Sequence, residues 1–406
     1  MAPHAGQPDL LHSRRGFGSG IGAAAAASGT SAAPEAAGTT ASSPTPLVLS
    51  ACVYISEGRC QEVLSRLEAT LRAAPGTALL HIFMDAEYNR TGYTLASLSP
   101  DALTSAVVAV CREAIGCVDL RSHKATHPRL GVADHVSVQP LAWPEASSRD
   151  DALASAASVA RSIGRQLLGS CEAQGKEAAG SCPVYYYGAA YSSGGRRLAD
   201  VRRALGYFRP DVLSAGAALW AGELGVASLS HFPPDEGPCQ VSPRTGVATI
   251  GAVPFVLNYN VPLQTVDLAF ARTAAKAVSE RGGGLRGVEA MALFHGEGCV
   301  EVACNLLDVG EGAAPADVQA FLEEFSGLGA LSRLKVLPWL RAAWKSRAAF
   351  WTSRGGAAPA EVHAFLERTC APAGVSVGQG YTTGKTAEQL VQMMLAQLSG
   401  DGSAQP

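Results

Sequence analysis

Two histidines and three cationic side chains lie within the eleven residues from Arg121 to Gly131, which read RSHKATHPRLG. An imidazole titrates near neutrality, so it can take up and return a proton during a reaction. Pro128 pushes His127 toward an extended backbone, which disfavours a helical pair of metal ligands with His123. We therefore expect a cationic turn that presents His127 for proton transfer.

The charges near His127 bear on its protonation state. Arg121, Lys124 and Arg129 would lower the pKa of the imidazole and favour a neutral base. The alternative is a histidine that holds a turn together through a hydrogen bond. His123 and His135 have weaker claims, and the three histidines lack Cys or Glu neighbours at the spacing of a metal site. We predict no metal, and we interpret the ten cysteines, which form no C-x-x-C pair, as mostly buried thiols.

Two arginines border apolar strand candidates. Arg90 follows the run Ala78–Met84, and Arg244 precedes the run Val247–Val261. A guanidinium in such a place can hold a carboxylate through two parallel hydrogen bonds. These arginines indicate a small anionic ligand, while the alternative for each of them is a solvated surface charge.

The composition describes a globular chain with little net charge. Of 406 residues, 47% are hydrophobic and 17% are charged, and the formal net charge is -3. This length and apolar content predict two to three domains or subdomains with buried cores. The weak negative charge argues against a general nucleic-acid binder, which relies on a basic surface. No run approaches the roughly 18 apolar residues of a membrane span, so we predict no transmembrane segment.

Residues 1–46 differ in texture from the rest, because Ala, Gly, Ser, Thr and Pro dominate them. Such a segment buries too little surface to offset the entropy of ordering, and we predict disorder. Arg14, Arg15 and few acidic residues are compatible with a transit peptide for plastid or mitochondrion. The alternative is a low-complexity tail without a targeting signal, and the default localisation is then cytoplasmic.

From Leu47 onward, strand and helix patterns alternate. Ser56 stands where it could cap a helix that carries Val63, Leu64, Leu67 and Leu71 on one face. We expect further strands at 78–84, 132–141, 183–187, 247–261, 288–294 and 300–306, and further helices at 101–115, 151–168, 196–207 and 264–281. This order predicts an α/β (α+β) fold of two layered subdomains, each a mixed or antiparallel sheet with helices packed on it. The turn-rich loop 230–246 suggests subdomains at 47–246 and 247–400.

The last part of the chain contains a repeat. Residues 312–323 recur at 356–367, with ten of twelve positions identical. Between the copies, a basic segment rich in tryptophan at about 327–355 is compatible with a membrane-surface or partner helix. The alternative is a duplicated or non-native insertion outside the core.

Several short segments, taken in order, match a known family. They are YISEG at 54–58, NRTGYT at 89–94, HPRLG at 127–131, PVYYYG at 183–188, Gly237-Pro238 with Gly246, NYNV at 258–261 and VACNLL at 302–307. With these segments the chain resembles the formiminotransferase domain of formiminotransferase-cyclodeaminase, and more closely its plant and algal single-domain relatives. The resemblance covers roughly Ala51–Leu306 and resumes near Gly374–Leu398.

The resemblance implies transfer of a formimino group from N-formimino-L-glutamate to N5 of tetrahydrofolate, within histidine and one-carbon metabolism, by a homodimer with folate between two subdomains. The family's catalytic histidine corresponds to His127. Its folate-contacting loop corresponds to Gly237, Pro238, Cys239, Gln240, Val241, Ser242, Pro243, Arg244, Thr245 and Gly246, which we expect to face His127 across a cleft. Substrate carboxylates would bind among Asp85, Asn89, Arg90 and Arg129. Tetrahydrofolate is then a co-substrate, and no metal is needed.

Two departures from the family pattern leave alternatives open. Animal enzymes carry a D-x-D pair where this chain reads His81-Ile82-Phe83, so that Asp85 would replace the missing carboxylate or the substrate differs. The chain also ends without a cyclodeaminase domain. A non-catalytic reduced-folate-binding protein and a formyltransferase that uses 5-formyltetrahydrofolate are the alternatives.

Overall fold

The computed structural model describes residues 47–144, 147–172, 182–207, 220–221, 229–296, 298–307, 309 and 356–399. They all belong to the compact unit Ser43–Pro406. The predicted N-terminal tail, the first copy of the repeat and the tryptophan-rich insertion lie outside the described residues. The statements below concern the described ranges.

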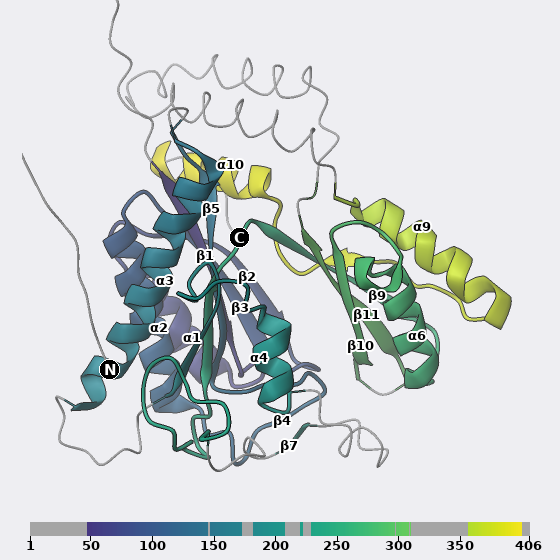
Figure 1. Cartoon of the computed structure of the whole chain (residues 1–406), viewed down its shortest axis with the longest axis horizontal. Coiled ribbons are helices and arrows are strands. Elements are labelled where there is room, and N and C mark those ends of the chain that lie inside the picture. Colours follow the sequence, from purple (N-terminus) through teal and green to yellow (C-terminus); the bar gives the residue numbers. More distant parts are fainter. Residues whose placement is uncertain are drawn as a thin grey trace, which may run out of the picture. The chain divides into compact units, whose positions relative to one another are not determined.

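A six-stranded mixed sheet carries two of the predicted site residues, Asp85 and Arg90, at the ends of neighbouring strands. Its order is β2 (Ala78–Asp85), β3 (Arg90–Ser97), β1 (Val48–Ile55), β5 (Ala133–Ala142), β8 (Ala248–Ala252) and β6 (Val184–Gly188). β1 runs antiparallel to β3 and β5, whereas β8 runs parallel to β5 and β6. Helices α1 (Gln61–Arg72), α2 (Pro100–Cys117) and α3 (Arg149–Glu172) cover one face of this sheet (Figure 1).

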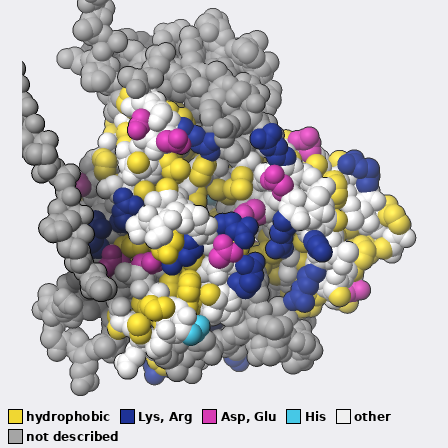
Figure 2. Space-filling model, viewed as in Figure 1, with side chains coloured by type: hydrophobic (Ala, Val, Ile, Leu, Met, Phe, Trp, Pro, Cys, Tyr) yellow, Lys and Arg dark blue, Asp and Glu magenta, His cyan; other side chains and the backbone are white. Residues whose placement is uncertain are grey.

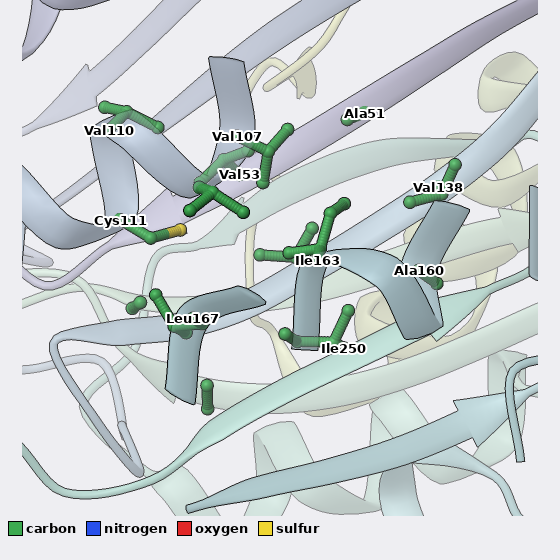
Figure 3. Packing of buried hydrophobic residues seen from close by; sticks show 14 of the residues in the cluster. Ala51, Val53, Val107, Val110, Cys111, Val138, Ala160, Ile163, Leu167 and Ile250 are labelled. Carbon is green, nitrogen blue, oxygen red and sulfur yellow. The ribbon is translucent and has the colours of Figure 1, made fainter. Parts of the chain in front are cut away.

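The first core lies between this face and the three helices. Ala51 and Val53 of β1 point toward Val107 of α2 and Ile163 of α3, and all four side chains are fully buried (Figure 3). Burying each larger aliphatic side chain contributes about 1.5–3 kcal/mol. Because successive side chains of a strand point to opposite faces, the β1 residues that alternate with Ala51 and Val53 point to the other face of the sheet.

A second, antiparallel sheet follows in the chain. Its order is β10 (Val288–Phe294), β11 (Val300–Leu307), β9 (Val256–Leu263) and β12 (Tyr381–Thr382). Helix α6 (Leu268–Val278) packs on β10 and β11, α9 (Pro359–Cys370) packs against α6, and α10 (Ala387–Ser399) contacts β2. The smaller elements are β4 (Lys124–Ala125), α4 (Leu198–Ala204), β7 (Trp220–Ala221), η1 (Glu280–Gly282) and η3 (Ala371–Ala373). The predicted class, with helices packed on a mixed and an antiparallel sheet, is confirmed.

Two local expectations are wrong. Ser56 caps no helix, since its hydroxyl donates to the Gly131 carbonyl at 2.8 Å and α1 begins at Gln61. The expected strand 247–261 is two strands in different sheets, because the chain passes from β8 to β9 at Val253–Phe255. The second copy of the repeat forms the start of α9.

The division into subdomains at 246 stays a prediction.

Candidate functional site

The face of the six-stranded sheet opposite α1, α2 and α3 carries a ladder of polar pairs. Ser50, Cys52 and Tyr54 of β1 lie directly opposite the β5 residues Gln139, Ser137 and His135. The rings of Tyr54 and His135 stack with centroids 5.6 Å apart, and His135 Nε2 lies 2.6 Å from the Tyr187 hydroxyl. Residues that alternate with the apolar core therefore line a cavity of about 390 Å³.

Residues of the second sheet and of α10 form other walls of this cavity. Tyr54 donates its hydroxyl to Oδ1 of Asn258 at 3.1 Å, and Asn258 in turn donates to Asn305 at 2.7 Å. The cationic lining residues are Arg196, Arg197 and Lys385. A cavity of this size, with aromatic walls and a few polar groups, is typical of small-molecule sites.

A buried ion pair lies behind the tyrosine. Nη1 of Arg90 lies 2.5 Å from Oδ2 of Asp134, and the Arg90 guanidinium also lies 4.5 Å from the centre of the Tyr54 ring. Burial acts to raise the pKa of Asp134, but the charges of Arg90 and Arg202 outweigh it and lower that pKa to about 2. Among the described residues, Nε of Arg90 has no hydrogen-bond partner. An unpaired buried donor of this kind is uncommon in folded proteins.

His127 is half-buried and is fixed in one tautomer. Its Nδ1 lies 2.7 Å from the carbonyl oxygen of Pro128, which can only accept a hydrogen bond. The proton of the neutral ring is therefore on Nδ1, and Nε2 carries the lone pair that can accept a proton. The ring also makes edge contacts with Tyr88 at 5.1 Å and with Tyr207 at 6.3 Å between centroids.

The pKa of His127 is lowered, which favours the neutral imidazole, but the cause differs from the expected one. Burial and the charges of Arg90 and Arg202 lower the pKa of His127 to about 3. Arg90 comes from β3 and Arg202 from α4, so these cations are distant in sequence. The neighbouring Arg129 instead donates from Nε to Nδ1 of His123 at 2.8 Å.

The other predicted carboxylate contacts are already bonded within the protein. Arg129 also donates to the carbonyl of His123, and Asn89 accepts from Gly58 N and donates to the Lys124 carbonyl. Asp85 accepts from Tyr88 N at 2.8 Å and pairs with Nε2 of His295 at 2.9 Å. Asn89 also has a positive φ, 45°, in the turn before Arg90. This geometry gives Asp85, Asn89 and Arg129 positioning contacts, and their roles toward a substrate stay predictions.

The predicted folate loop packs directly on the chain that follows His127. Val132 N donates to the Thr245 carbonyl, Val247 N donates to the Leu130 carbonyl, and Gly131 forms a bridge with Gly246. Gly237, Pro238, Cys239, Gln240 and Pro243 are exposed, whereas Val241, Ser242 and Arg244 are half-buried and Thr245 and Gly246 are buried. Arg244 donates to the Gly116 carbonyl at 2.8 Å. None of these loop residues lines the 390 Å³ cavity, so contact of the loop with folate stays a prediction.

Sequence reasoning missed three groups that the fold brings together. Arg202 lies on α4 near His127, and its guanidinium is 4.4 Å from the centre of the Tyr207 ring. His295 joins the site from the turn between β10 and β11. The polar ladder of β1 and β5 did leave a signal, because polar and apolar residues alternate in 49–55 and in 135–139.

Surface charge, metal-ligand groups and helix hydropathy in the described residues bear on the predicted partners. Figure 2 shows Lys and Arg side chains interspersed with Asp and Glu on the face it displays. In the part of the chain that the structure describes, no group of three or more His, Cys, Asp or Glu residues could hold a metal ion. Within the same ranges, no helix is both long and apolar enough to cross a membrane.

Comparisons of the sequence with known proteins identify a family to which this chain is similar. A model of the family described as "Formiminotransferase domain, N-terminal subdomain" matches residues 48–253. The "Formiminotransferase cyclodeaminase-like protein" of Arabidopsis thaliana is 39% identical over 275 residues, which are 67% of this chain and 85% of that protein. The "Glutamate formimidoyltransferase" of Thermoplasma acidophilum is 27% identical over 253 residues, which are 62% of this chain and 74% of that protein.

A longer relative matches over part of its length. The "Formimidoyltransferase-cyclodeaminase" of Rattus norvegicus is 27% identical over 261 residues, which are 62% of this chain and 42% of that protein. The matched range 48–253 contains His127, Arg90, Asp134 and the strands of the six-stranded sheet. The chain belongs to the formiminotransferase family.

Proposed function

We propose that the protein transfers a formimino group from N-formimino-L-glutamate to N5 of tetrahydrofolate, with His127 as the proton acceptor. The observation that carries this proposal is the neutral imidazole of His127, whose Nδ1 proton is held by the Pro128 carbonyl. Attack by N5 on the formimino carbon leaves a proton on N5 that must be removed. An imidazole with a free Nε2 lone pair can take it. The names of the two relatives from Arabidopsis and Thermoplasma support the reaction class.

The charges near His127 suit an anionic donor. Arg90 and Arg202 both place positive charge close to the imidazole. Formiminoglutamate carries two carboxylates, and such clamps would hold it for attack. We infer that Arg90 and Arg202 bind the donor.

The cavity suits a reduced folate as co-substrate. Tyr54, His135 and Tyr187 offer aromatic surface to a pterin ring, and Lys385 and Arg196 offer charge to the folate glutamate. Tyr54 links the cavity to the proposed donor site, because its ring also contacts the Arg90 guanidinium. The exposed loop Gly237–Gly246 stays a proposed second contact for folate. No metal enters this proposal.

Purified protein and the variant His127→Ala test the assignment. We expect the native protein to form 5-formimino-tetrahydrofolate, and the variant to lose about 10²–10⁴-fold in kcat with its tetrahydrofolate affinity retained. His231→Ala is the matched control, because His231 is exposed and lies outside the cavity lining. Full activity in the His127 variant would contradict the role of this residue.

A second candidate function is binding of reduced folate without turnover. The motivating observation is that His81 and Phe83 occupy β2 where animal enzymes carry carboxylates, while both oxygens of Asp85 are already bonded. Tight tetrahydrofolate binding with no transfer from formiminoglutamate would favour this candidate. Turnover of 5-formyltetrahydrofolate alone would identify a formyltransferase.

We also propose that the chain acts as a homodimer, on the basis of the family resemblance. Size-exclusion chromatography with light scattering measures the mass directly. A mass of about two chains is expected, and a monomer at micromolar concentration would contradict it.

A further inference from the structure

A second histidine in this region is held between two carboxylates. Nε2 of His295 lies 2.9 Å from Oδ2 of Asp85, and Nδ1 lies 3.5 Å from Oε1 of Glu301. Asp85 comes from the end of β2 and Glu301 from β11, which belong to different sheets. The side chain of His295 is 27% exposed, so the ring is not sealed inside the protein.

The groups around His295 favour its charged form. The titratable or charged groups that face it are Asp85 at the end of β2, Glu87 and Tyr88 in the turn after β2, and Glu301 of β11, to which Tyr381 is bound. The hydrogen bond to Asp85 raises the pKa of His295, burial opposes this, and the charge of Glu301 adds to it. Glu87 also lies beside Gly296, where a Cβ would come within 3.2 Å of its carboxylate. Protonated His295 can donate from both ring nitrogens.

The ring of Tyr88 contacts both His295 and His127. Its ring makes edge contacts with His295 at 4.6 Å and with His127 at 5.1 Å, and its hydroxyl donates to Glu301 at 2.6 Å. Glu301 also accepts from Asn260 and Tyr381, so the cluster is fixed from three strands of the second sheet and from the β2–β3 turn. Two titratable groups in contact with one ring, shifted in opposite directions, are the usual arrangement of an acid and a base.

We infer that His295 is the proton donor of the transfer reaction and that His127 is its proton acceptor. This inference rests on the proposed function. It gives the Asp85–His295–Glu301 cluster a chemical role, and it explains why Asp85 is bonded to His295 instead of standing free.

The protons and electrons of the transfer then balance. The N5 lone pair forms a bond to the carbon of the protonated formimino group, and the C=N π pair moves to the formimino nitrogen. His127 takes the proton from N5. His295 gives its proton to the glutamate nitrogen as the bond from carbon to that nitrogen breaks, and the formimino nitrogen re-forms its double bond to carbon. Exchange with water then removes the proton from His127 and restores the one on His295.

The variant His295→Gln tests the inference, because an amide can still bond to Asp85 but cannot supply a proton at neutral pH. We expect native tetrahydrofolate affinity, a protein that stays folded at the assay temperature, a loss of about 10²-fold or more in kcat, and loss of the alkaline limb of the kcat–pH profile. His363→Gln is the matched control, since His363 is also 27% exposed and lies 3.5 Å from a carboxylate, that of Glu367. Native kcat or a native pH profile in His295→Gln would overturn the inference.

Nuclear magnetic resonance of protein with ¹⁵N-labelled histidine supplies a readout that does not depend on turnover. At pH 6 we expect His295 to be protonated and His127 to be neutral, and Asp85→Asn should move the His295 titration to lower pH. A neutral His295 at pH 6 would overturn the inference even in an active enzyme. Native protein without transfer from any donor would instead overturn the proposed function, and the proton-donor role with it.

Discussion

Arg90 and Asp134 form a buried ion pair in which Nη1 lies 2.5 Å from Oδ2 and the side chains are 9% and 1% exposed. The same carboxylate accepts from the backbone N–H of Leu130 and Gly131, which follow His127 by a few residues. The pair therefore fixes the turn that follows His127 to β3 and β5, and it places a positive charge beside His127.

Replacing Arg90 by Met should be strongly destabilising, because the charge of Asp134 would stay buried without its partner. We expect a loss of about 3–5 kcal/mol in the free energy of unfolding, measured by urea denaturation. Arg203→Met is the control, since the Arg203 side chain is 56% exposed beside Asp200 and its ion pair is worth about 1 kcal/mol or less. Equal losses in the two variants would contradict the interpretation.

Gly131 should tolerate no side chain. A Cβ at this position would lie 2.0 Å from the carbonyl oxygen of Val247, against the bridge that joins the His127 segment to the loop Gly237–Gly246. Gly131→Ala should cost about 1–3 kcal/mol or more by overpacking. Gly116→Ala is a matched substitution within α2 where a Cβ meets nothing within 4 Å, and it should stabilise the protein by about 0.5–1 kcal/mol. Thermal unfolding of both variants decides the point.

The pair of Asp85 and His295 should make stability depend on pH. The folded pKa of His295 is raised, so its contribution is present below the unfolded value of about 6.5 and is lost as pH rises through the folded value. The folded pKa of Asp85 is lowered, because bonds to His295 and Tyr88 outweigh burial, so its contribution is lost only in acid. Asp85→Asn should thus cost about 1.5–3 kcal/mol near pH 5 and less near pH 9. A difference that does not change with pH would contradict this assignment.

Lys385 should contribute charge to folate binding if the cavity holds the co-substrate. Lys385→Gln is expected to weaken tetrahydrofolate binding several-fold to about tenfold, equivalent to about 1.4 kcal/mol, with a smaller effect at high salt. Lys276→Gln on the exposed face of α6 is the control, because Lys276 does not line the cavity. Calorimetric titration at two salt concentrations measures both effects. Unchanged affinity in Lys385→Gln would place the glutamate of folate elsewhere.

Local patterns in the sequence were sufficient to predict most elements of the fold. The start of α2 is one example, because Ser99 accepts from Ala102 N and Pro100 begins the helix. Apolar runs predicted β2, β10 and β11 to within a residue. These signals depend on residues that are close together in the sequence, as helix capping and hydrophobic periodicity do.

The failures come from partners that are distant in sequence. Ser56 has the side chain of a capping residue, but the Gly131 carbonyl takes its hydroxyl. The run 247–261 looks continuous, and only the pairing of β8 with β5 and of β9 with β11 divides it. His295 meets Asp85 across 210 residues of chain, a contact that no local pattern could reveal. The cause of the lowered pKa of His127 was missed for the same reason.

Side chains along β1 alternate between the two faces of the sheet, so its odd-numbered residues pack in the core and its even-numbered residues from Ser50 to Tyr54 line the cavity. Leu49, Ala51, Val53 and Ile55 pack under the helices, whereas Ser50, Cys52 and Tyr54 line the cavity. Deleting one residue early in this strand would move the polar set into the apolar core and the apolar set into the cavity. Insertions or deletions tolerated within β1 must therefore come in pairs, and stability and ligand binding constrain the length of this strand together.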